Sequence, residues 1–173
     1  MMAFEYGGDD YIDSRDLIKR MEELNDTYES LNDQVDFMAE IVNDYAEQIE
    51  EFENEGDELP EELWDRAEQA DVDHKLALEA LDEFVTSEEY DELQELIRVD
   101  KECSLYAPEW EDGVTLINID KFTEYTQQYA RDIGVASDDE TWPYTCINWD
   151  EAADELAMDY TTVEFYGTTY LYR

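Results

Sequence analysis

Apolar residues recur in alternating steps of four and three along residues 17–52, with no acidic residue among them. This heptad repeat places one apolar stripe along an α-helix. Asp13 or Ser14 can cap the start of such a helix, and Gly56 and Pro60 mark its end. The repeat predicts a helix of about 40 residues, roughly 60 Å long. We call its apolar stripe the first seam, which consists of Leu17, Met21, Leu24, Tyr28, Leu31, Val35, Met38, Val42, Tyr45, Ile49 and Phe52.

A second apolar repeat follows Pro60, and its alanines would let another helix approach closely. Thr86 with Glu89 resembles a capping box that opens a third helix through Ile97. The short connection at residues 55–59 favours antiparallel packing of the first two helices into a hairpin. The first seam can close within one chain or between two chains, as in a homodimer. The second seam consists of Leu63, Ala67, Ala70, His74, Ala77, Leu81 and Phe84.

From about Ser104 shorter segments replace the long repeats. The predicted strands and helices of this part span residues 114–117, 122–133, 150–159, 162–166 and 168–172, the last two as a hairpin around Gly167. The fold class is therefore α+β, with a long acidic antiparallel helical hairpin, coiled-coil-like, followed by a small C-terminal α/β module. We divide the chain into a lead-in at 1–13, the hairpin with its short third helix at 14–103, and the module at 104–173.

The composition adds a core and an extreme charge to this picture. The 173 residues are 43% hydrophobic and 13% aromatic, which is enough apolar material for a core. Fifty-one Asp and Glu oppose ten Lys and Arg, which leaves a formal net charge of -41. Such self-repulsion opposes compaction unless a cationic partner, high salt or bound cations offset it. The charge also argues against direct binding to nucleic acid or to anionic lipid.

The sequence also indicates where the protein resides. No run reaches the length of a transmembrane helix, and residues 1–10 are acidic rather than signal-like. We therefore expect a soluble, cytoplasmic protein, in the host cytoplasm if the source is viral. Cys103 and Cys146 lack metal-site spacing, and without a signal peptide two ordinary thiols are expected.

The acidic residues are concentrated in the first predicted helix and its turn. No Lys or Arg occurs between Arg20 and Arg66, a stretch that holds 18 Asp and Glu. At a rise of about 1.5 Å per residue this is one charge per ~4 Å of helix. Two such helices approach one per ~2 Å, against about 1.7 Å for duplex DNA. An ordinary coiled coil interleaves Lys with Glu, so this pattern favours imitation of DNA.

A DNA-like surface would bind a cationic DNA-binding host protein through exposed carboxylates. The candidate partner-binding residues lie on the first helix, with a secondary patch on the helix near residue 150. No Lys or Arg occurs between Arg131 and Arg173 around that patch. The candidates are Glu29, Asp33, Asp36, Glu40, Asp44, Glu47 and Glu51, together with Asp150, Glu151, Asp154 and Glu155.

Four stretches near the C-terminus form a further pattern. Residues 122–134 precede an aromatic-Asp-x-x-Ala helix at 147–156, an acidic-Tyr pair at Asp159-Tyr160 and a terminal aromatic strand. This last third of the chain resembles the ArdA-type antirestriction proteins of phages and mobile elements. The resemblance implies an elongated, usually dimeric duplex-DNA mimic that blocks Type I restriction–modification enzymes.

The rest of the chain departs from that family. The N-terminal Tyr-Asn-x-Gly and Gly-x-Trp elements of those proteins have no counterpart here, where the predicted hairpin stands instead. The target is therefore open among a restriction enzyme, a CRISPR effector and another DNA-handling host protein.

Catalysis finds little support in the sequence. Carboxylate pairs arise by chance among 51 acids, and no glycine-rich phosphate loop, nucleophile elbow or Cys–His dyad is present. His74 has no second His or Cys near it in the sequence, so zinc is not expected. We predict no enzymatic activity, no catalytic residues, no metal site and no cofactor.

Two other interpretations compete with DNA mimicry. The hairpin can be an acidic coiled-coil interaction module, or a chaperone for a basic protein, that binds through its seam residues such as Leu31 and Met38. The charge can also reflect adaptation to high salt, in which case the protein should unfold in dilute buffer. The sequence does not identify the target of any of these activities.

Overall fold

The computed structural model describes residues 9–56, 58–137 and 142–173. It is mixed α+β, with one long helix and a four-stranded antiparallel sheet, which confirms the coarse fold class. The chain divides into two compact units. Unit 1 consists of residues 1–21 and 95–173, and unit 2 consists of residues 22–94. Residues 1–8 of the predicted lead-in lie outside the described ranges.

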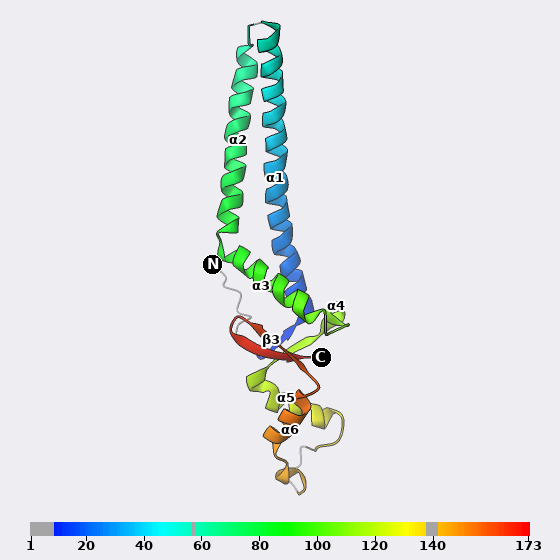
Figure 1. Ribbon diagram of the computed structural model, residues 1–173. Coiled ribbons are helices and arrows are strands. Elements are labelled where there is room, and N and C mark those ends of the chain that lie inside the picture. Colours follow the sequence, from blue (N-terminus) through cyan, green and yellow to red (C-terminus); the bar gives the residue numbers. More distant parts are fainter. Residues whose placement is uncertain (1–8, 57, 138–141) are drawn as a thin grey trace. The chain divides into compact units, whose positions relative to one another are not determined.

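The elements follow the predicted order closely (Figure 1). The helices α1 to α6 span Ser14–Glu55, Glu61–Val85, Glu88–Cys103, Trp110–Gly113, Phe122–Asp132 and Trp149–Ala157. The strands β1 to β4 span Tyr11–Asp13, Thr115–Asn118, Thr161–Phe165 and Thr168–Tyr172.

Unit 2 is an antiparallel helical hairpin in which α1 and α2 lie side by side (Figure 1). Its turn follows the sequence signals: α1 ends at Glu55, Gly56 adopts a left-handed φ of 75°, and α2 begins after Pro60. Glycine takes this backbone conformation without steric cost at the end of a helix. The predicted stop residues of the long helix are therefore confirmed.

The first seam of α1 meets α2 of the same chain. The ring of Tyr28 lies 6.3 Å from that of Phe84, and Met38 lines the same groove as Ala77. Ala70 and Ala77 are buried, whereas the seam residues of α1 from residue 31 to 52 are only partly buried. Two helices alone cannot enclose a seam, so apolar surface remains accessible along the hairpin.

The third helix begins one residue later than its capping signal suggested. The hydroxyl of Ser87 accepts a hydrogen bond from the backbone N–H of Tyr90, which makes Ser87 the capping residue. Thr86 instead donates its hydroxyl to the carbonyl oxygen of Asp82 at the end of α2. The capping box at Thr86 and Glu89 is therefore wrong, because the Thr86 side chain closes the preceding helix.

Unit 1 is built on an antiparallel sheet with the strand order β1-β2-β4-β3. Strand β1, which we assigned to the lead-in on sequence grounds, pairs with β2 so that Ile12 lies opposite Leu116. Strand β2 in turn places Ile117 opposite Leu171 of β4. The sheet thus takes one strand from the start of the chain and three from beyond residue 114.

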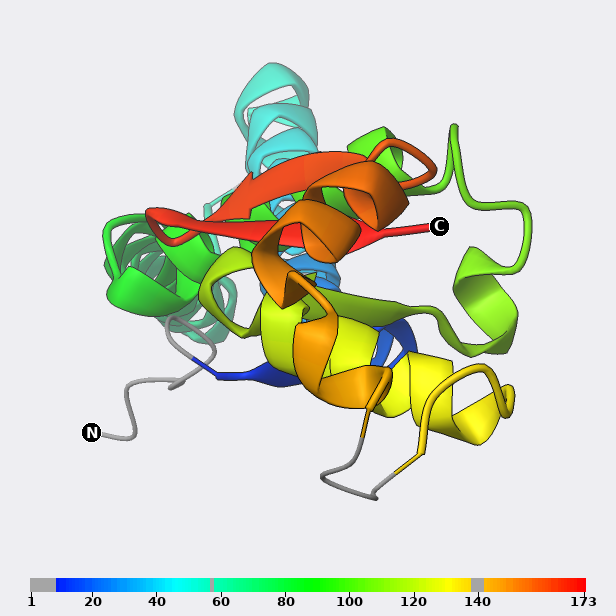
Figure 2. The ribbon, with the colours of Figure 1, turned by 90° about the horizontal axis from the view of Figure 1, so that it is seen from below.

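Both faces of the sheet of unit 1 are covered. On one face Ile117 and Leu171 pack with Phe122 of α5 and Ala153 of α6, and Figure 2 shows these helices in front of the strands. The other face carries Tyr172, whose ring lies 6.3 Å from that of Trp110. Its other fully buried side chains are Leu116, Val163, Phe165 and Tyr170.

The predicted terminal hairpin is present and has a tight turn. Tyr166 and Gly167 connect β3 to β4, with φ values of 47° and 75°. Two successive residues with positive φ form the turn whose twist suits a two-residue β-hairpin. A glycine at the second of these positions explains why the strands could be located from the sequence.

The two cysteines differ in accessibility, which predicts different reactivity. Both are free; Cys103 is buried and Cys146 is exposed. Burial raises the pKa of the Cys103 thiol from 9.0 to about 12, and the thiolate is the reactive form. At pH 8 we expect Ellman's reagent to titrate one thiol in the native protein and two in guanidinium chloride. Two fast-reacting thiols in the native protein would contradict the buried position of Cys103.

The same pKa shift predicts a loss of stability in alkali. The folded protein holds the Cys103 proton more tightly than the unfolded chain does. The protonated thiol therefore contributes to the free energy of unfolding, and this contribution is fully present below pH 9. The contribution is then lost as the pH rises from 9 towards about 12.

Candidate partner-binding surfaces

The seven candidate acids of α1 form one exposed stripe within unit 2. All seven side chains are exposed. Counted at about 100° per residue, their positions fall within a sector of about 80° and extend over ~33 Å of helix. At about 100° per residue, the positions of the stripe fall on the side of α1 opposite to the positions of the first seam. The stripe therefore lies on the outer side of α1. We call it the α1 acidic stripe, which consists of Glu29, Asp33, Asp36, Glu40, Asp44, Glu47 and Glu51.

The charge around the stripe has one sign. Residues 22–55 of α1 carry 13 Asp and Glu and no Lys or Arg. Unit 2 as a whole holds 28 acids against Arg66 and Lys75, a formal charge of -26. Lys75 forms an ion pair with Asp71 on its own helix. The negative charge is therefore uninterrupted by any cation along residues 22–55 of α1.

Hydrogen bonds within the helix organise the polar side chains near the stripe. The amide of Asn25 donates to Glu29 at 2.8 Å, and those of Asn32 and Gln48 donate to backbone carbonyls one turn earlier. The carboxylates project from a hydrogen-bonded helical backbone. A cationic partner would therefore meet charges whose spacing along the axis is set before binding.

The uniform charge predicts that salt stabilises the fold. Raising NaCl from about 0.02 M to about 0.5 M shortens the screening length from roughly 20 Å to roughly 4 Å. Because repulsion among 28 acids opposes the compact hairpin, we expect the Tm to rise by about 5 °C or more. Differential scanning calorimetry at constant pH measures this shift. A Tm that falls with NaCl would show that ion pairs, not repulsion, dominate.

The four candidate acids of the secondary patch lie on α6 in unit 1. Asp150, Glu151, Asp154 and Glu155 are exposed, whereas Ala153 of the same helix is buried in the core. The hydroxyl of Thr123 donates to Asp150 at 3.5 Å, and the amide of Asn148 donates to Glu151 at 3.2 Å. The stripe on α1 and the patch on α6 belong to different units, so each is a separate candidate surface.

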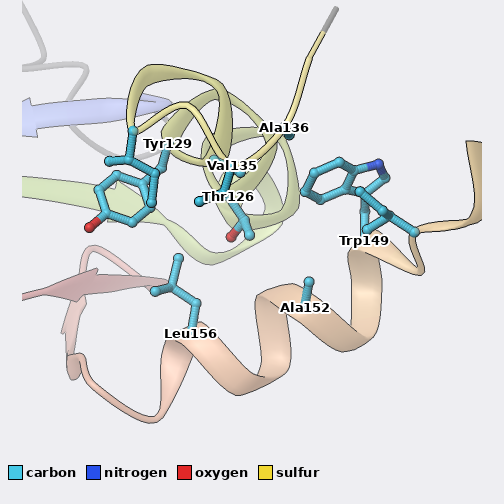
Figure 3. Close-up of a pocket in the computed structure, with 10 residues that line it drawn as sticks. Thr126, Tyr129, Val135, Ala136, Trp149, Ala152 and Leu156 are labelled. Atoms are coloured by element: carbon cyan, nitrogen blue, oxygen red, sulfur yellow. The ribbon is translucent and has the colours of Figure 1, made fainter. Parts of the chain in front are cut away.

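Helices α5 and α6 also border an apolar hollow of about 280 Å³. Thr126 and Tyr129 lie on the α5 side and Trp149, Ala152 and Leu156 on the α6 side (Figure 3). The hydroxyl of Thr126 is engaged, because it donates to the carbonyl of Phe122 at 2.8 Å. Among residues 9–56, 58–137 and 142–173, those that line the hollow contribute no carboxylate, imidazole, amine or thiol. The hollow therefore offers apolar contact rather than acid–base chemistry.

The basic end of the chain is held against aromatic rings. The guanidinium of Arg173 lies 4.9 Å from the ring centre of Tyr160 and 5.4 Å from that of Tyr129. The hydroxyls of Tyr125 and Tyr160 are 2.9 Å apart. Cation–π contacts of this kind anchor the end of β4 to α5.

The described part of the chain has neither a cluster of metal-ligating side chains nor a membrane-spanning helix. Among residues 9–56, 58–137 and 142–173, no group of three or more His, Cys, Asp or Glu side chains is placed to hold a metal ion. Over the same ranges, no helix combines the length and apolarity needed to cross a bilayer.

The structure adds apolar surface residues that the sequence analysis did not single out. Phe37, Trp64 and Leu76 on the hairpin are 58%, 55% and 56% exposed. Each lies outside the two seams and directly next to a seam residue. An apolar residue at an outer heptad position, where the acids otherwise dominate, is the signal by which they could have been found.

Comparison with known proteins adds no relative. No protein-family model, no curated protein and no solved structure matches this chain.

Proposed function

We propose that the protein is a DNA mimic that occupies the cationic DNA-binding groove of a host defence enzyme, a restriction–modification enzyme or a CRISPR effector. The observation that carries the proposal is the acidic face of α1. Its residues 22–55 hold 13 exposed or partly exposed acids and no cation. Over ~50 Å of helix this is one charge per ~4 Å, and α2 adds nine more acids beside it.

The energetics of such binding follow those of DNA itself. A groove that neutralises phosphates with Lys and Arg would meet carboxylates that are already held in place by a helix. Release of condensed counterions from the two surfaces favours association, and the affinity falls steeply with salt. Carboxylates also accept paired hydrogen bonds from guanidinium groups, as phosphates do.

The exposed patch on α6 supports the same function in unit 1. It lies in the part of the chain that resembles ArdA-type antirestriction proteins, including the Trp149-Asp150-x-x-Ala153 pattern. A second acidic surface would extend the contact beyond what α1 supplies. The resemblance favours a Type I restriction–modification enzyme as the first target to test.

The test is a competition experiment with a defined competitor. Immobilised protein is incubated with a purified Type I restriction–modification enzyme, and in parallel with a CRISPR effector. Retained enzyme is then eluted with duplex DNA or with poly-glutamate of equal charge. We expect retention of at least one enzyme, elution by duplex DNA and by about 0.5 M NaCl, and much weaker elution by poly-glutamate.

The other outcomes separate the competing functions. Retention that duplex DNA cannot displace would favour the acidic interaction module over DNA mimicry. Equal elution by poly-glutamate would show that any polyanion suffices. Unfolding of the protein in dilute buffer would favour adaptation to high salt.

A further inference from the structure

An apolar groove runs along one side of the hairpin in unit 2. It has a volume of about 220 Å³ and is lined by Gln34 and Met38 of α1 and by residues of α2. The α2 residues are Asp73, Leu76, Ala77 and Ala80. Of these residues Ala77 is buried, Ala80 is half-buried and the Leu76 side chain is 56% exposed.

Helical spacing places an exposed aromatic side chain of α1 next to the groove. Phe37 lies three residues after Gln34 and four before Ile41, so these three side chains share one side of the helix. Phe37 is 58% exposed. Phe37 and Leu76 thus add exposed apolar surface next to the groove on both helices, and contiguous apolar surface of this kind marks sites of interaction.

The rim of the groove is acidic. Asp73 lines it directly, and the exposed Asp33 and Glu40 lie four residues before and three after Phe37 on the same side of α1. A ligand that fills the groove therefore needs an apolar face about as wide as one helix, with cationic side chains on both sides of that face. An amphipathic helix rich in Lys or Arg has that arrangement, and Met38 provides an adaptable contact for it.

The charge of the hairpin excludes the main alternatives. A second copy would bring another -26 charges against the first. Nucleic acid and anionic lipid are repelled for the same reason. The chain itself has only ten Lys and Arg in 173 residues and no basic amphipathic segment to fold back.

We propose that the groove lined by Met38 and Leu76, with Phe37 beside it, binds a basic amphipathic helix of a protein partner. Asp33 and Glu40 belong to both this rim and the α1 acidic stripe, but the apolar groove is not needed for DNA mimicry, so the two proposals are tested separately. It would give the hairpin a means of selecting one cationic protein among many, because charge alone does not discriminate between them.

The probe is a fluorescein-labelled 18-residue peptide of Leu and Lys, with the leucines at helical spacing. A scrambled isomer has the same composition and charge. Fluorescence anisotropy is measured at about 0.5 M NaCl, where the screening length is roughly 4 Å. We expect the full-length protein to bind the amphipathic isomer at least about tenfold more tightly than the scrambled isomer.

Two double variants decide whether the groove is the site. Phe37→Ser with Leu76→Ser should abolish the preference and leave binding of the scrambled peptide unchanged. Trp64→Ser with Leu78→Ser is the matched control, because both residues are exposed, occupy the same heptad position of α2 as each other and do not line this groove. The control should keep the preference, and far-UV circular dichroism checks that both variants are helical.

Two results would overturn the proposal. One is equal binding of the two isomers by the unaltered protein. The other is a preference that survives in the Phe37→Ser, Leu76→Ser variant, which would show that the acidic surface merely induces helix in the peptide. Neither result bears on competition by duplex DNA for a restriction enzyme, so the DNA-mimic proposal stands or falls separately.

Discussion

Replacing Trp110 with alanine is expected to lower the free energy of unfolding of unit 1 by roughly 3–5 kcal/mol. The side chain is 2% exposed, and its ring packs on Tyr172. Its indole N–H donates to a carboxylate oxygen of Asp100 at 2.8 Å. The substitution would open a large cavity and leave that carboxylate without its donor, and both changes are costly inside a protein.

Trp110 also connects segments that are distant in sequence. Ser14 donates its hydroxyl to the carbonyl of Trp110 at 2.6 Å and accepts a hydrogen bond from the N–H of Val114. The start of α1 is thereby fixed to the segment that leads into β2. Loss of the indole should loosen this junction as well as the core.

Urea unfolding followed by far-UV circular dichroism measures the effect, since removal of a tryptophan would confound fluorescence. Trp142→Ala is the matched control, because Trp142 is 81% exposed. We expect the control to change the free energy of unfolding by less than about 0.5 kcal/mol. A Trp110→Ala variant within about 1 kcal/mol of the unaltered protein would contradict the buried position of the ring.

Sequence patterns predicted the elements whose formation depends on residues within or next to the element itself. The long helix follows from an unbroken heptad repeat, and its end follows from Gly56 and Pro60. The β3–β4 hairpin follows from alternating residues around Gly167. In each case the residues that specify the element lie within or beside it, so a periodic pattern is sufficient.

The parts that were not predicted depend on distant partners. Strand β1 is only three residues long, and Ile12 finds its partner Leu116 about a hundred residues later. Nothing in Tyr11-Ile12-Asp13 by itself distinguishes a strand from a lead-in. The role of Trp110 has the same origin, because its neighbours Asp100 and Tyr172 come from other elements.

Of the candidate binding surfaces, one could be predicted from the sequence and the other could not. Exposure of the acidic stripe could be anticipated, since acids that avoid a seam must point outward. The groove lined by Met38 and Leu76 could not be anticipated, because it requires knowledge of which residues of α2 lie opposite Met38. Register between two helices is a tertiary property that neither repeat encodes alone.

Reversing alternate charges of the α1 acidic stripe should separate folding from binding. The variant combines Glu29→Lys, Asp36→Lys, Asp44→Lys and Glu51→Lys, and it leaves the intervening acids in place. Each new lysine then lies three or four residues from an acid, a spacing that stabilises isolated helices by about 0.2–0.5 kcal/mol per pair. We therefore expect the Tm to rise or stay constant.

Binding should respond in the opposite direction. The four reversals change the formal net charge from -41 to -33 and replace a uniform stripe by alternating signs. A cationic groove would then meet repulsion at about every second contact. We expect at least ~100-fold weaker binding to the retained restriction or CRISPR enzyme at about 0.15 M salt, with a shallower salt dependence.

The matched control places the same charge change elsewhere. Glu109, Asp120, Asp132 and Glu164 are exposed acids of unit 1 outside the α6 patch, and their reversal to lysine also gives -33. If affinity depended on net charge alone, both variants would weaken equally. A loss of binding confined to the α1 variant, with its helix intact, is the result that DNA mimicry by this stripe requires, whereas unchanged binding by that variant would exclude it.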